Sequence, residues 1–271
     1  MTDRKNWLPA CSTSWSAPGA ALYKDLVAAG IHHVELCGKT PQFWAQLDFI
    51  HRAQDVVAEM RAFEVAPSSM HLPFSPSNKM DPTSPDKTIR EQIIKLDGEL
   101  LRAGADAGIP IAVVHPSCEP YRGSERGERM RYSIETLHAL TEIATECGIR
   151  LAVENLPRTC LGNIHEEMQL ILNEIPDLYA CFDTNHSLRQ PNPDFIRAIG
   201  KRIITIHASD YDMIDERHLL PFLGRNDWAG ILRALEESDY NGFFTFEVPC
   251  KDVLTTQNLR LAYDKMMEIT E

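Results

Sequence analysis

Six apolar segments of the sequence each end at a histidine or an acidic residue. These side chains are His71, His115, Glu154, Asp183, His207 and Glu247. Histidine, aspartate and glutamate bind divalent metal ions and move protons at neutral pH. A single acid after a strand is usually a helix N-cap, and a single histidine is usually a hydrogen-bonded core residue. Six of them at equivalent positions favour one shared site, because polar groups are costly to bury without partners.

The elements that must position these residues follow a regular rhythm. Apolar, often β-branched segments alternate with longer amphipathic stretches, which indicates βαβ units around a parallel sheet. Eight strands are predicted, at residues 8–12, 31–37, 65–71, 109–115, 149–154, 178–183, 202–207 and 242–247. The length of 271 residues matches the roughly 250 residues typical of one (β/α)₈ barrel. We therefore predict a single (β/α)₈ TIM barrel domain over residues 1–271.

Two further features of the pattern concern helices and loops. Residues 42–63 predict one amphipathic helix, with Leu47 and Ile50 on the face that packs against the sheet. The connections at 72–86 and 208–226 are longer than the others. Long loops after barrel strands commonly cover a functional site, so we expect both to act as lids.

The last four predicted strands are consecutive, so they should be neighbours around the barrel. Glu154, Asp183, His207 and Glu247 can then face one ion. Three carboxylates and one imidazole suit Mn²⁺ or Zn²⁺, with Co²⁺, Mg²⁺ and Fe²⁺ as the other candidates, and they argue against copper. Without a cation, the three carboxylates would repel one another and raise one another's pKa. We therefore predict one divalent metal ion at this site.

Composition argues against several classes of partner. The chain has 27 basic and 39 acidic residues, a net charge of −12, and this field repels nucleic acid. No segment approaches the roughly 20 apolar residues that a membrane helix needs, and the N-terminus lacks a signal-peptide pattern. Seven cysteines without a Cys-x-x-Cys pair fit reduced thiols. We expect a cytoplasmic protein without a membrane partner, and the sequence leaves a homo-oligomer open.

Several motifs resemble the xylose isomerase-like TIM barrel superfamily, which contains sugar isomerases and epimerases as well as endonuclease IV. The motifs are Leu-Ala-Val-Glu-Asn (151–155), Phe-Asp-Thr-Asn-His (182–186), Ile-Thr-Ile-His-Ala-Ser-Asp (204–210), Asp-Glu-Arg-His-Leu-Leu-Pro-Phe-Leu-Gly-Arg-Asn-Asp-Trp (215–228) and Phe-Phe-Thr-Phe-Glu (243–247). The resemblance covers essentially the whole chain. It is specific for the superfamily and poorly specific for the substrate.

The resemblance implies roles for individual residues. In ketose 3-epimerases of this type, the residues that match Glu154, Asp183, His207 and Glu247 bind the metal, and the two glutamates are also the acid/base groups. The positions that match His186 and Arg217 touch oxygens of the sugar. We predict substrate contacts for His71, His115 and His218 as well. An alternative for Arg217 is a loop arginine paired with Asp215.

These observations lead to a preferred function. We expect a metal-dependent isomerase or epimerase that removes a proton next to a carbonyl, through a metal-stabilised enediolate. Its substrate would be an unphosphorylated sugar, a polyol or a keto acid. A sugar phosphate is less easily excluded than nucleic acid is. Glu154 and Glu247 come from strands on different parts of the rim, so they can address opposite faces of a bound sugar. This arrangement suits epimerisation.

Two alternative functions use the same site. A sugar or cyclitol dehydratase would share the first step and then expel a β-hydroxyl. An endonuclease IV-like phosphodiesterase would hold several zinc ions. The residues that match ligand positions of that branch are His71, His115, Glu154, Asp183, His186, His207, His218 and Glu247, while Glu216 stands where that branch has Asp. The net charge of −12 argues against a DNA substrate. A sugar-binding protein without turnover is least supported, because the full ligand set is present.

Overall fold

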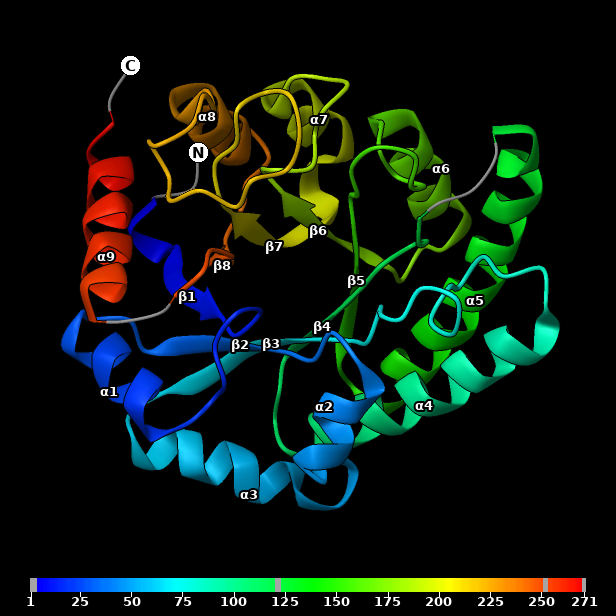
Figure 1. Cartoon of the computed structure of the whole chain (residues 1–271). Helices are drawn as coiled ribbons and strands as arrows, with labels where there is room; N and C mark the ends of the chain where they lie inside the picture. Colours follow the sequence, from blue (N-terminus) through cyan, green and yellow to red (C-terminus); the bar gives the residue numbers. More distant parts are fainter. Residues whose placement is uncertain (1–3, 120–122, 251–252, 270–271) are drawn as a thin grey trace.

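The computed structural model describes residues 4–119, 123–250 and 253–269. Eight parallel strands close into a barrel in the order β1 to β8, and helices form a ring around it (Figure 1). The strands are β1 (Leu8–Ser12), β2 (His33–Cys37), β3 (Ala66–His71), β4 (Ile111–Val114), β5 (Arg150–Glu154), β6 (Tyr179–Asp183), β7 (Ile203–Ala208) and β8 (Phe243–Phe246). The predicted (β/α)₈ barrel is confirmed. The prediction of one domain over 1–271 includes residues outside the described ranges.

Helices follow the strands in the alternation that the sequence predicts. They are α1 (Ala20–Ala28), α2 (Pro41–Gln46), α3 (Phe49–Ala62), α4 (Lys87–Asp106), α5 (Arg126–Cys147), α6 (His165–Glu174), α7 (Asn192–Ile199), α8 (Trp228–Glu237) and α9 (Val253–Glu268). Short 3₁₀ turns occur at Arg4–Asn6, Gly123–Glu125 and Gly200–Arg202. Asp86 caps α4 by accepting a 2.9 Å hydrogen bond from the backbone of Thr88. Gly148 ends α5 in the left-handed conformation, at φ 81°.

The observed strands lie within two residues of their predicted bounds at either end. Two residues of the predicted site, however, lie just beyond a strand. His115 follows β4, and Glu247 follows β8. Both therefore stand on the rim at the carboxyl end of the barrel, where barrel enzymes build their active sites.

The prediction of one helix over residues 42–63 is wrong. The chain forms α2 and α3, separated by Asp48, which has left-handed backbone angles of φ 48° and ψ 40°. A left-handed residue interrupts the ladder of i to i−4 hydrogen bonds, so the second helix starts in a new direction. As a result Ile50, which the prediction placed on the face that packs against the sheet, is 39% exposed. The buried face of α3 contains Phe49 and Val57.

The barrel interior contains both apolar and polar side chains. Ile111, Val113, Ala152 and Cys181 form a small buried cluster inside it, separate from the large core between strands and helices. Fully buried polar side chains also come from the strands, namely Glu35, Ser69, Thr205 and Thr245. Such groups need partners, and the partners of Glu35 belong to the site described below. Within the described ranges, no helix is long and apolar enough to cross a membrane.

Asp97 on α4 is a buried acid outside this site. Its side chain is 1% exposed, and its Oδ1 atom has no hydrogen-bond partner among the described residues. Burial raises the pKa of Asp97 well above its ordinary value, because the ionised carboxylate loses its hydration. The folded protein therefore holds this proton to a higher pH than the unfolded chain does.

We predict that Asp97→Asn removes a pH-dependent loss of stability. An unfolded aspartate titrates near about 3.9, so the wild type loses folding free energy as pH rises from there toward the raised folded pKa of Asp97. Asparagine resembles the protonated acid and does not titrate. The melting temperature of D97N relative to wild type should rise between about pH 4 and about pH 8. Asp106→Asn, at an exposed position of α4, is the control. A pH-independent difference for D97N would contradict the account.

Candidate metal centre

Strands β5 to β8 bring four side chains to one point on the rim. Glu154 ends β5, Asp183 ends β6, His207 lies in β7 and Glu247 follows β8. The β6–β7 register pairs Asp183 with His207, and the backbone N–H of Glu247 donates to the carbonyl of Ala208. One ligand atom from each of the four side chains lies within 4.8 Å of the others. The structure thus gathers the four residues that the sequence predicts as metal ligands.

The imidazole of His207 lies at the centre of this group. Its Nδ1 atom is 3.1 Å from Glu154 Oε1, 3.3 Å from Glu247 Oε2 and 3.9 Å from Asp183 Oδ2. All four side chains are buried, and Asp183 Oδ2 has no hydrogen-bond partner among the described residues. A buried anionic oxygen without a partner is strongly unfavourable. A divalent cation would remove this penalty, and the mixed oxygen and nitrogen donors suit such an ion.

Two acids of the group favour the ionised form. Burial opposes ionisation of Glu154, but the imidazoles of His207 and His115 outweigh it and hold the pKa of Glu154 well below its ordinary value. Burial also opposes ionisation of Glu247, but His207 and His218 hold the pKa of Glu247 well below its ordinary value. Both glutamates are therefore carboxylates at neutral pH.

The other two ligands favour the protonated form. Burial, together with the negative charges of Glu247 and Glu154, raises the pKa of Asp183 well above its ordinary value. Burial lowers the pKa of His207, but Cys181, Glu35 and Glu154 raise it more, so that pKa also lies well above its ordinary value. Protons on Asp183 and His207 thus offset the negative charge of the cluster, and a bound cation would displace them.

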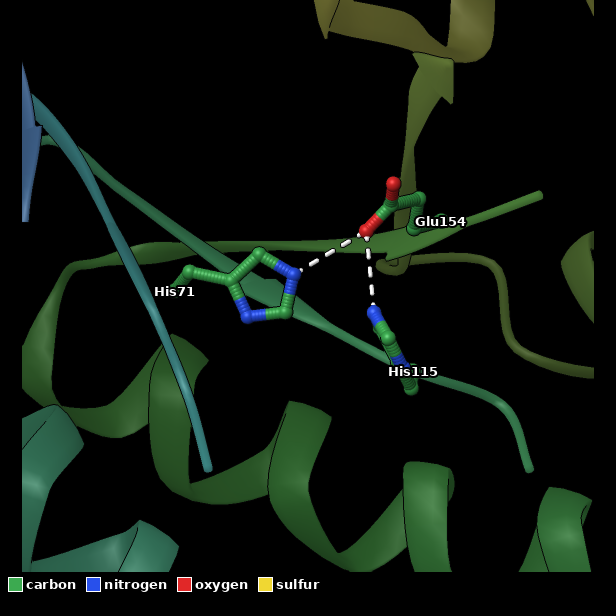
Figure 2. Close-up of side chains that lie close together, drawn as sticks. All are labelled: His71, His115 and Glu154. Carbon is green, nitrogen blue, oxygen red and sulfur yellow. Dashed lines mark hydrogen bonds and ion pairs between the residues drawn. The ribbon is translucent and has the colours of Figure 1, made fainter. Parts of the chain in front are cut away.

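A second group of ligand-type side chains shares Glu154, as Figure 2 shows. His71 Nε2 lies 3.0 Å and His115 Nε2 lies 3.2 Å from Glu154 Oε2. The other ring nitrogen of His71 is 2.9 Å from the carbonyl of Leu72, which can only accept a hydrogen bond. A neutral His71 would therefore turn a lone pair toward Glu154. A proton or a cation must lie between them, and Glu154, against the effect of burial, raises the pKa of His71.

A third group lies beside the first, because His186 is 3.4 Å from Glu154 and His218 is 3.9 Å from Glu247. It consists of His186, Glu216 and His218, whose ligand atoms also lie within 4.8 Å of one another. His186 Nδ1 is 2.9 Å from the carbonyl of Asn155, so its Nε2 atom is left to face Glu216 at 3.6 Å. Glu216 is also 3.4 Å from Arg158. Each of the three groups has the residues to hold an ion.

Arg217 stands apart from these groups. Its side chain is 46% exposed and pairs with Asp212 at 2.7 Å, whereas Asp215 pairs with Arg158 at 2.8 Å. Arg217 is therefore a loop arginine paired with an acid, as the alternative stated, but its partner is Asp212 and not Asp215. The backbone N–H of Arg217 donates to Asn185 Oδ1 at 3.0 Å, and the backbone N–H of Asn185 in turn donates to Asp183 Oδ1.

Several residues of the site were not predicted from the sequence. Ser14 Oγ donates to Glu247 Oε1 at 2.8 Å, and Asn155 Oδ1 accepts from the backbone of Asp183 at 2.7 Å. Glu35 lies 3.1 Å from His207. A signal existed for Glu35, because it is a charged residue inside an apolar strand segment. None existed for Ser14, which lies in a loop rich in serine.

Aromatic rings flank the histidines of the site. Phe74, from the long loop after β3, stacks on His115 with ring centroids 4.3 Å apart. Trp15, from the loop after β1, meets His218 edge to face at 4.6 Å. Apolar ring faces beside polar groups are typical of small-molecule binding sites.

Comparison with known proteins agrees with this architecture. The family model described as "Xylose isomerase-like TIM barrel" matches residues 23–269. The chain therefore belongs to the xylose isomerase-like TIM barrel family.

Individual proteins of known sequence or structure are also similar to the chain. The chain is 28% identical over 253 residues to an L-ribulose 3-epimerase of Methylomonas sp. (strain DH-1), covering 87% of this chain and 80% of the relative. It is 28% identical over 215 residues to an uncharacterized protein of Methanocaldococcus jannaschii, covering 73% and 72%. A D-tagatose 3-epimerase-like protein of solved structure superposes with a TM-score of 0.80, at 22% identity, over 95% of this chain and 97% of that one.

We predict that metal binding at this centre releases protons. Asp183 and His207 have raised pKa values, so both bind protons until a cation replaces them, on the order of one to two protons per ion. Affinity for Mn²⁺ should therefore fall as pH is lowered from about 8 to about 6. Calorimetric titration in two buffers of different ionisation enthalpy measures the release. Affinity that does not change with pH would exclude these two residues as ligands.

Proposed function

We propose that this protein is a divalent-metal-dependent epimerase or isomerase of a small sugar. The observation that carries the proposal is the meeting of two buried glutamates, Glu154 and Glu247, at one imidazole on the barrel rim. Their strands, β5 and β8, are not adjacent in the closed barrel, so the carboxylates approach the site from different directions. Similarity to an L-ribulose 3-epimerase supports this reaction class.

In the proposal, Glu154, Asp183, His207 and Glu247 hold one divalent ion. Mn²⁺ or Zn²⁺ is preferred, with Co²⁺, Mg²⁺ and Fe²⁺ as the other candidates. When bound, the ion supplies Lewis-acid polarisation of the substrate carbonyl. The four side chains fix its position because each is buried and each comes from a strand or strand end.

The two glutamates divide their oxygens between two tasks. Glu154 Oε1 and Glu247 Oε2 face His207, so these are the atoms for the ion. Glu247 Oε1 accepts a hydrogen bond from Ser14, and Glu154 Oε2 faces His71 and His115. We assign proton transfer to these second oxygens. One removes the proton next to the carbonyl. The other first takes up a proton from solvent or from a neighbouring imidazole and then returns it to the opposite face, which inverts the carbon.

Substrate binding is assigned to the surrounding polar side chains. His115, His186 and His218 line the rim around the two glutamates, and they offer ring nitrogens to substrate hydroxyls. His71 is 1% exposed and contacts Glu154 Oε2, so it also holds Glu154 in place. Arg217 completes the proposed set, and its exposed side chain would have to leave Asp212 to reach a substrate.

The charge of the rim favours an uncharged sugar or polyol. The loop after β7 carries several acids, namely Asp210, Asp212, Asp215 and Glu216. Arg217 of this loop pairs with Asp212, and Arg158 from the loop after β5 pairs with Asp215. A phosphate would have to compete with these carboxylates. A keto acid remains the other candidate class, and a dehydratase on the same site would begin with the same proton removal.

A second candidate function is a multinuclear phosphodiesterase. The observation in its favour is that all three ligand groups have the residues for an ion, with Glu154 shared by two of them. Several metal ions close together can activate water and stabilise the leaving oxygen of a phosphodiester. Against it stand the net charge of −12 and the acidic loop after β7, since phosphate backbones are bound chiefly by Lys and Arg.

The proposal is tested by incubating protein of measured metal content with a panel of ketoses in deuterated water. We expect about one ion per chain, uptake of deuterium at the carbon next to the carbonyl, and formation of the epimer. Loss of water from the substrate would instead identify a dehydratase. Close to three zinc ions per chain, together with cleavage of abasic-site DNA and no exchange in any ketose, would establish the phosphodiesterase.

We predict that the four ligands fall into two functional pairs. Glu154→Gln and Glu247→Gln keep one oxygen for the ion and lose the group that carries the proton, so turnover should fall about 10²- to 10⁴-fold with metal retained. Asp183→Asn and His207→Ala should fail through loss of metal, and excess metal should restore part of their activity. The exposed Glu174→Gln on α6 is the control. Near-normal turnover by E247Q with metal bound would exclude the two-base mechanism.

A further inference from the structure

Glu35 is a charged side chain inside the barrel, below the layer of proposed ligands. It lies in the middle of β2 and is 0% exposed. Its Oε2 atom accepts a 2.8 Å hydrogen bond from Ser69 Oγ on β3 and lies 3.1 Å from His207 Nε2 on β7. A carboxylate from one side of the barrel thus reaches across the interior to a proposed metal ligand on the other side.

This contact determines which nitrogen of His207 can bind a metal. An ionised carboxylate can only accept hydrogen bonds, so the Nε2 atom of His207 must carry the hydrogen. The lone pair of the neutral ring is then on Nδ1, the atom that faces Glu154 and Glu247 at 3.1 and 3.3 Å. Ser69 holds the same oxygen of Glu35, so the carboxylate itself is fixed in place.

Two other histidines of the site, His71 and His186, are held differently. Nδ1 of His71 lies 2.9 Å from the carbonyl of Leu72, and Nδ1 of His186 lies 2.9 Å from the carbonyl of Asn155. These partners are neutral backbone oxygens. A carboxylate partner makes an imidazole a stronger electron donor to a metal than a neutral carbonyl does. His207 thus has a carboxylate as the nearest partner of its outer nitrogen, at 3.1 Å, where His71 and His186 have a backbone carbonyl.

Burial of Glu35 does not serve stability. Its Oε1 atom has no hydrogen-bond partner among the described residues, and an incompletely paired buried carboxylate destabilises a fold. Thr245 on β8 is paired with His207 in the strand register. It shows that uncharged side chains of moderate size fit in the same interior. Positions that break the rules of packing are expected at functional sites.

We propose that Glu35 is a positioning residue that fixes the ring orientation and tautomer of His207 for metal binding. This inference rests on the metal site of the proposed function, though not on the identity of the sugar. It predicts that Glu35→Gln, which preserves size, weakens metal affinity about 10- to 100-fold. Glu35→Asp keeps the charge but is one methylene too short for the 3.1 Å contact, so it should weaken binding as well.

The test is titration of the metal-free protein with Co²⁺, followed by visible absorption. The absorption band that is lost in His207→Ala marks the site. In E35Q and E35D this band should shift, and its titration midpoint should move to a higher Co²⁺ concentration. Thr245→Val is the matched control, because it removes a buried hydroxyl without a partner among the described residues and preserves size. Thermal unfolding of the metal-free variants checks that each one folds.

The outcomes separate the inference from the function on which it rests. Wild-type affinity and spectrum in E35Q would overturn it. Weak binding by E35Q with wild-type binding by E35D would also overturn it, because charge without contact would then suffice. The expected shifts in a protein that exchanges no ketose proton would support the role of Glu35 and refute the epimerase proposal. A wild-type protein that binds no Co²⁺ would overturn both.

Discussion

The buried carboxylate of Glu154 is the group around which the site is organised. It is 1% exposed, yet it lies within 3.0 to 3.4 Å of four imidazoles, those of His71, His115, His186 and His207. A charge so deeply buried is stable only with opposite charge beside it. Each of these rings must present a proton or a metal ion to the carboxylate. The demand for positive charge at Glu154 therefore explains why so many histidines converge here.

Tertiary hydrogen bonds and ion pairs between neighbouring strand ends and loops hold the residues of the rim in position. Asn155 links β5 to β6, because its side chain bonds both the N–H and the C=O of Asp183. Arg158 links three loops, with Glu119 on one side and Asp215 and Glu216 on the other. Its backbone has a positive φ of 52°, a strained conformation that such a set of contacts can maintain. These contacts hold the strand ends and loops of the rim together.

Much of this architecture could be predicted from the sequence, because short apolar segments that alternate with amphipathic stretches indicate the buried parallel strands and the helices between them. Strands that end at Asp183 and His207 must place both side chains at the same end of a parallel barrel, so their convergence follows from topology alone. The break at Asp48 could not be predicted in the same way. Its left-handed backbone interrupts a stretch whose apolar spacing fits one continuous helix.

The side-chain contacts inside the site also could not be predicted from the sequence pattern. Glu35 on β2 contacts His207 on β7 through the barrel interior, and Ser14 contacts Glu247, which is far from it in the sequence. Neither contact leaves a periodic signal, because each depends on the direction of one side chain in the closed fold. Likewise, the sequence places His71 and His115 near Glu154 but does not show that both approach the same oxygen.

The central claim is that Glu154, Asp183, His207 and Glu247 bind a divalent ion in common. It is tested most directly by a crystal structure of the Mn²⁺-loaded protein with anomalous diffraction measured at the manganese edge. The account predicts an anomalous peak at roughly 2.0 to 2.3 Å from an atom of each of the four side chains. A loaded crystal with no peak among these residues, or with a peak only elsewhere, would contradict it.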